Sequence, residues 1–130
     1  MVKSDDVDFE IQFYEGILEK KGDFFQALMA LGNLYTQKGL YQKGLAVDKK
    51  LVRLRPKDPL VLYNLACSYS LLNKIDQAFK AMRDAFSCGY NDFDYLQNDG
   101  DLANLLEDTR FKKYLLAVKI PPNPPLKKGG

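Results

Sequence analysis

The residues that could carry chemistry are few, and they do not form a recognisable catalytic set. The chain has no histidine, so the commonest general base and the commonest zinc ligand are both missing. Its cysteines, Cys67 and Cys88, therefore lack a histidine to activate them, and so low a cysteine count is typical of a reducing compartment. Asp99 and Asp101 flank Gly100, which is typical of turn and capping residues. We expect no catalysis, no cofactor and no metal site.

A repeated pattern organises the chain. Residues 28–35 read Leu-x-x-Leu-Gly-x-x-Tyr and residues 62–69 read Leu-x-x-Leu-Ala-x-x-Tyr, so matching positions lie 34 residues apart. The same offset relates Gly44 to Ala78. A fixed period of this length indicates a stack of similar helical units. Within the first unit Gly32 lies in mid-helix, where glycine costs about 1 kcal/mol relative to alanine, which indicates that a neighbouring helix crosses too closely for a side chain.

The pattern resembles the tetratricopeptide repeat, a helix–turn–helix unit with Leu-Gly, then Tyr, then a small residue, and Pro near its end. Pro56 stands at that end in the first unit. The chain departs from the signature at Asp48, where an aromatic residue is usual, and at Tyr90, where Pro is usual. The resemblance implies an all-α, right-handed solenoid of antiparallel helix pairs, with about two and a half repeats and a closing helical cap.

Helical spacing and turn residues divide the chain into five predicted segments. They are an N-terminal half-repeat helix at 1–22, a first repeat at 23–57, a second repeat at 58–91, capping helices at 92–119 and a proline-rich disordered tail at 120–130. The first helix carries Phe9, Phe13 and Ile17 on one apolar stripe. We expect Asp23 and Asp58 to cap the helices that follow them.

A second stripe on the first helix of each repeat is the candidate binding surface. In the family that the chain resembles, these helices line a concave groove that holds a segment of a partner protein. The candidate groove residues are Gln26, Met29, Asn33 and Gln37 in the first repeat, and Leu60, Tyr63, Asn64, Cys67 and Leu71 in the second. Leu60, Tyr63 and Leu71 are large apolar residues for a stripe that faces solvent, which favours a contact surface. Alternatively, some of these residues touch the next helix.

Asn33 and Asn64 occupy the positions of an asparagine pair with which some family members clamp a partner's terminal carboxylate. The basic positions of that clamp carry Met29, Asp94 and Asn98 in this chain, so its cationic donors are missing. A side-chain amide can still pair with both N–H and C=O of an extended backbone. The resemblance therefore implies a protein-interaction scaffold that binds a peptide segment in its groove.

The charge of the chain and its pattern of apolar residues bear on whether it binds partners other than a peptide. A net charge of +2 is too small to indicate nucleic acid, although basic residues gather between positions 43 and 57. That cluster is either a solvated helix face or a site for an anionic partner. Self-assembly into a homo-oligomer is the rival function, because the opening half-repeat leaves an edge that a second chain could cover. The chain shows no apolar export signal and no membrane-spanning run, so we expect a cytoplasmic protein.

Overall fold

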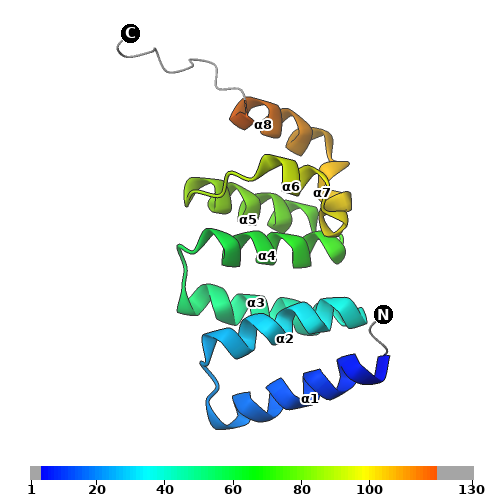
Figure 1. Ribbon diagram of the computed structural model, residues 1–130. Helices are drawn as coiled ribbons and strands as arrows, with labels where there is room; N and C mark the ends of the chain where they lie inside the picture. Colours follow the sequence, from blue (N-terminus) through cyan, green and yellow to red (C-terminus); the bar gives the residue numbers. More distant parts are fainter. Residues whose placement is uncertain (1–3, 120–130) are drawn as a thin grey trace.

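The computed structural model describes residues 4–119, which fold entirely into helices and the turns between them. The helices are α1 (Ser4–Lys20), α2 (Phe25–Lys38), α3 (Tyr41–Leu54), α4 (Pro59–Leu71), α5 (Ile75–Ser87), α6 (Phe93–Gln97), the 3₁₀ helix η1 (Gly100–Leu102), α7 (Ala103–Leu106) and α8 (Thr109–Lys119). Figure 1 shows them following one another along a single stack, from α1 at one end to α8 at the other. The all-α solenoid is confirmed. The predicted tail at 120–130 lies outside the described residues.

Capping residues and turns set the ends of the helices. Asp58 caps α4 as predicted, because its carboxylate accepts hydrogen bonds from two backbone N–H groups of the first turn. Asn73 adopts the left-handed conformation, with φ 58°, in the turn between α4 and α5. The predicted cap at Asp23 is wrong. Phe24, in an extended conformation, is the residue that precedes α2, and Asp23 instead lies 3.6 Å from the ammonium of Lys21.

Each helix of the stack buries its apolar face against its neighbours. Helix α1 packs on α2, α2 on α3, α3 on α4 and α4 on α5. Leu28, Leu51 and Val61 come from three successive helices and form one buried cluster. Ala66 and Ala78 are fully buried in the cluster shared by α4 and α5. These small side chains allow the backbones of the two helices to approach closely.

Helix α1 buries a different face from the predicted one. Val7 and Ile11 are each 8% exposed and pack with residues of α2. Phe9 and Phe13, which belong to the predicted stripe with Ile17, are 70% and 56% exposed. Both pairs are spaced four residues apart, so both satisfy the helical period, and the packing against α2 selects the aliphatic pair. The phenylalanine pair is left on the open side of α1.

The segments after α5 close the other end of the stack. Leu96, Leu102, Leu105 and Phe111 are fully buried in the cluster that α4 and α5 begin. Ser70 of α4 is also fully buried, and its Oγ accepts a hydrogen bond from the backbone N–H of Leu105 at 3.1 Å. These contacts cover the last apolar face of the solenoid, as a terminal unit of such a stack must do.

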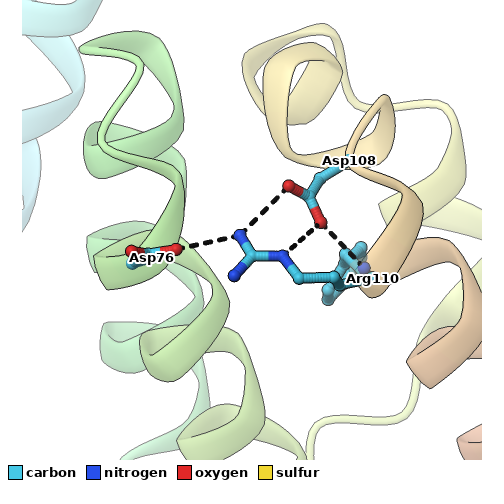
Figure 2. A network of polar contacts seen from close by, with 4 residues as sticks. Asp76, Asp108 and Arg110 are labelled. Carbon is cyan, nitrogen blue, oxygen red and sulfur yellow. Dashed lines mark hydrogen bonds and ion pairs between the residues drawn. The ribbon is translucent and has the colours of Figure 1, made fainter.

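An exposed polar network ties α8 back to α5 (Figure 2). The guanidinium of Arg110 donates to Asp76 of α5 at 2.8 Å and to Asp108 at 3.1 Å. Asp108 also caps α8, because it accepts from the backbone N–H of Phe111. Hydrogen bonding from Arg110 lowers the pKa of Asp108. Because exposed ion pairs add little stability, this network mainly fixes where α8 lies.

We expected a neighbouring helix to leave no room for a side chain at Gly32, but the structure has room for a methyl group there. A Cβ atom at this position would lie 3.4 Å from Cγ1 of Val47 and 3.4 Å from Oδ1 of Asp48, which is an ordinary contact distance. We predict that Gly32→Ala raises the free energy of unfolding by about 0.5–1 kcal/mol, because alanine is the better helix former. Urea denaturation followed by circular dichroism measures the change.

The matched control is Gly16→Ala in α1, where a Cβ would meet nothing within 4 Å. The two substitutions should stabilise the chain by similar amounts. If Gly32→Ala lowered stability while Gly16→Ala raised it, the helices would be too close for a methyl group and the prediction would fail.

Candidate functional site

A hollow of about 730 Å³ opens beside α2 and α4, and we refer to it as the central hollow. Side chains of α2, α3, α4 and the segment 90–101 line it. The lining residues are Gly32, Asn33, Thr36, Gln37, Asp48, Leu60, Tyr63, Asn64, Cys67, Ser68, Tyr90, Asp92, Tyr95, Asp99 and Asp101. The hollow therefore combines both repeats with the segment that follows them.

Six of the nine predicted groove residues line the central hollow. They are Asn33, Gln37, Leu60, Tyr63, Asn64 and Cys67. The other three are not part of its wall. Met29 packs against the buried cluster that joins α2, α3 and α4. Gln26 is exposed near the start of α2, and Leu71 is half-buried at the end of α4. A role for any of the nine in binding a partner stays a prediction.

Two side-chain amides face the hollow without an internal partner. Asn33 is exposed and Asn64 is half-buried, and neither side chain hydrogen-bonds to another residue in the range 4–119. Leu60, at the start of α4, is 50% exposed. The hollow thus presents two amides with unused donors and acceptors beside one open apolar side chain.

Tyr63 is turned inward, contrary to the expectation that it faces solvent. Its side chain is 2% exposed, and its hydroxyl donates to Oδ2 of Asp99 at 2.6 Å. Its ring stacks on Tyr90 with the centroids 4.5 Å apart. Burial and the Asp99 carboxylate raise the pKa of the Tyr63 hydroxyl. The segment after α5 folds over this ring, so Tyr63 is a fixed part of the wall.

Nine lining residues were not among the predicted groove residues, and Asp48 is the most informative of them. The side chain is 6% exposed, and Oγ of Ser68 donates to its Oδ2. Oδ1 accepts no hydrogen bond from a described residue. Every side-chain oxygen that is fully buried within residues 4–119 has a hydrogen-bond partner. Because Oδ1 has none, part of its surface is exposed to solvent, and Asp48 borders the hollow. The sequence signal that could have identified Asp48 is its departure from the repeat signature, which usually has an aromatic residue at this position.

Electrostatically, the central hollow is acidic. Its wall contains Asp48, Asp92, Asp99 and Asp101, and it contains no lysine or arginine. None of these four carboxylates belongs to an ion pair within residues 4–119. Burial and the neighbouring Asp99 raise the pKa of Asp101. Burial is also the main reason that the pKa of the Cys67 thiol is raised, and the charges of three of these aspartates add to the effect.

The basic cluster predicted from the sequence lies on α3 and the turn that follows it. Its members are Lys43, Lys49, Lys50, Arg53, Arg55 and Lys57. The guanidinium of Arg55 lies 3.6 Å from the ring centroid of Phe25. Lys43 and Lys49 lie over the rings of Tyr35 and Tyr69, at 5.5 Å and 5.9 Å. These cation–π contacts give half of the cluster a packing role, and no member of it lines the central hollow.

The buried charge of Asp48 generates a prediction about stability and pH. Burial raises the pKa of Asp48 from 3.8 to about 6 in the folded chain, against a weaker lowering by the Ser68 hydrogen bond. The native state therefore holds a proton that the unfolded state releases between these values, so this group lowers stability as the pH rises from about 4 to above 6. The pKa difference corresponds to about 3 kcal/mol at pH 7.

We predict that Asp48→Asn raises the free energy of unfolding at pH 7 by about 2–3 kcal/mol and has a much smaller effect at pH 4. Asparagine removes the buried charge and keeps an oxygen that accepts from Ser68. Urea denaturation of both chains at the two pH values measures this, with the exposed Asp23→Asn as the control. An equal gain at both pH values, or a loss at pH 7, would contradict the prediction.

Among curated proteins, the chain is similar to a chloroplastic protein of Arabidopsis thaliana, at 29% identity over 87 residues. The match covers 65% of this chain and 26% of that protein, so the chain matches about a quarter of the length of this relative. Separately, no helix in the described part of the chain is long and apolar enough to cross a bilayer.

Solved structures and a family model agree on the fold. The structure of MamA 41-end from Desulfovibrio magneticus RS-1 matches with a TM-score of 0.69 and 17% identity, over 88% of this chain and 67% of that one. A second structure, a crystal structure of MamA, matches with a TM-score of 0.66 and 20% identity, over 88% and 69%. A tetratricopeptide repeat model matches residues 25–58 and 60–87. The chain therefore contains two tetratricopeptide repeats, within residues 25–87.

Proposed function

We propose that this chain is a protein-interaction scaffold that holds an extended segment of a partner protein in the central hollow. The observation that carries the proposal is the gathering of six predicted groove residues from two repeats around one hollow of about 730 Å³. Stacked repeats of this kind use their concave surfaces for binding. The chain is proposed as non-enzymatic, because the family typically supplies scaffolds and the sequence has no histidine to activate a nucleophile.

The amides of Asn33 and Asn64 supply the proposed grip on the partner. Each amide offers an oxygen that accepts and an NH₂ group that donates, which matches the N–H and C=O of an extended peptide. Because neither amide is engaged within the described residues, binding breaks no internal hydrogen bond at these positions. Leu60 adds an apolar contact at one end of the hollow. Nucleic acid is not the proposed partner, because the carboxylates of the hollow repel phosphates.

We predict that Asn33→Ala and Asn64→Ala each weaken peptide binding by about tenfold, the effect of removing backbone hydrogen bonds in a partly buried site. The ligand for this test is a peptide selected from a displayed random library on the immobilised chain. Calorimetry with the wild type and the two variants measures the affinities.

The control for this series is Gln77→Ala, which removes an exposed amide on α5 outside the hollow. The control should bind the selected peptide as the wild type does. Equal affinities for all four chains would place peptide binding outside the central hollow and would overturn the proposed function.

Self-assembly through α1 is a second candidate function, and the exposed phenylalanines of α1 favour it. Phe9 and Phe13 are 70% and 56% exposed at one end of the stack. Neighbouring large apolar side chains left open to water typically mark a contact surface. In this proposal a second copy of the chain covers the open side of α1.

We predict that the double variant Phe9→Ser and Phe13→Ser abolishes any association of the chain, because it removes the apolar surface that a second copy would bury. Sedimentation velocity over a broad range of concentrations measures the mean mass in solution. The control is Leu116→Ser, which replaces a residue on α8 that is 61% exposed, and it should associate as the wild type does. A wild type that stays monomeric throughout would exclude this second function.

A further inference from the structure

The central hollow is unusual in concentrating negative charge on a chain that is slightly basic. The whole chain carries a net charge of +2, whereas the wall of the hollow holds four aspartates and no basic residue. A concave site lined by one sign of charge, with walls of low polarisability, focuses the field and attracts the opposite charge. A bound segment is therefore selected by its charge as well as by its shape.

Asp48 is the carboxylate that most needs a cation. It is 6% exposed, and carboxylates are rarely buried so deeply without a positively charged partner. Its only hydrogen bond within residues 4–119 comes from Oγ of Ser68 to Oδ2, so Oδ1 has no donor there, and Asp48 borders the hollow. A cationic donor that enters the hollow stabilises this carboxylate, whereas an apolar or anionic group leaves it unsatisfied.

The neighbouring residues are arranged to hold a cation near Asp48. Asp99 is fixed in place, because its Oδ2 accepts from the Tyr63 hydroxyl at 2.6 Å and its Oδ1 accepts from the backbone N–H of Asp101 at 3.0 Å. The half-buried carboxylate of Asp101 has no hydrogen-bond donor among the described residues. The carboxylates of Asp48, Asp99 and Asp101 all border the hollow, and the thiol of Cys67 in the same wall donates to Oδ2 of Asp99 at 3.8 Å.

The tyrosines complete this environment. The rings of Tyr63 and Tyr90 stack with their centroids 4.5 Å apart, and the ring of Tyr95 lies 6.1 Å from that of Tyr63. All three side chains border the hollow. Tyr95 is 60% exposed, and an open aromatic ring attracts ammonium and guanidinium groups, so this part of the wall favours the same class of ligand as the carboxylates do.

We propose that the central hollow contains a subsite for a lysine or arginine side chain of the bound segment, with its cationic group held by Asp48 and Asp101. This inference rests on the proposed function, because it names the kind of segment that the scaffold holds. The side-chain amides of Asn33 and Asn64 bind the backbone of the segment, and the carboxylates select its basic residue.

The test uses the full chain labelled with ¹⁵N and a series of capped, alanine-rich peptides that differ only at the central residue, which is lysine, arginine, norleucine or glutamate. NMR titration gives the dissociation constant and the residues whose amide signals shift. The lysine and arginine peptides should bind about tenfold more tightly than the norleucine peptide, as expected for a charge-assisted hydrogen bond in a partly buried site. The signals of Asn33, Asn64 and Asp101 should shift.

The variants Asp48→Asn and Asp101→Asn should each remove most of the preference for lysine over norleucine. Asp23→Asn, which removes an exposed carboxylate outside the hollow, should keep the full preference. Equal binding of the lysine and norleucine peptides at the hollow would overturn the cation subsite and leave the scaffold function standing. Shifts only outside the hollow, or none with any peptide, would overturn both.

Discussion

Each helix of this chain can bury its apolar face only against the next helix, and the rest of the structure follows from that constraint. Leu28, Leu51 and Val61 form a cluster because three successive helices meet there. Because of the same constraint, the outer apolar face at each end of the stack has no next repeat to cover it, and the two ends differ in how far it is covered. At one end the cap buries Phe111 completely, and at the other end α1 leaves Phe9 in contact with solvent. The middle of the stack is where a hollow can form between elements that are already held in place.

The irregular segment after α5 supplies part of the wall of the central hollow, through Tyr90, Asp92, Tyr95, Asp99 and Asp101. A complete third repeat would place a long helix beside α4, whereas in this chain the 3₁₀ helix η1 and the short helix α7 pack against α4. Asp99 lies between α6 and η1 and accepts the hydrogen bond from Tyr63, while Tyr90 stacks on the same ring. The two regular repeats and the irregular segment that follows them thus form the wall of the hollow together.

The parts of the fold that were predictable from the sequence depend on local signals. Asp58 marks the start of α4 through backbone chemistry that involves only neighbouring residues. The stripe that carries Asn33 and Asn64 follows from the helical spacing within each repeat. The buried face of α1 was not predictable, because two stripes satisfy the same spacing and only the contact with α2 decides between them. The covering of Tyr63 depends on a segment that begins 27 residues later in the chain, at Tyr90.

Asp48 joins the two repeats through its hydrogen bond with Ser68, and its burial has a thermodynamic consequence for the whole array. A buried carboxylate without a cationic partner makes the folded chain less stable than neutral side chains at this junction would make it. A guest that neutralises this anion binds the native state alone, and mass action then raises the melting temperature with guest concentration. Melting curves recorded at increasing guest concentrations therefore report both the stability of the solenoid and the occupancy of its hollow.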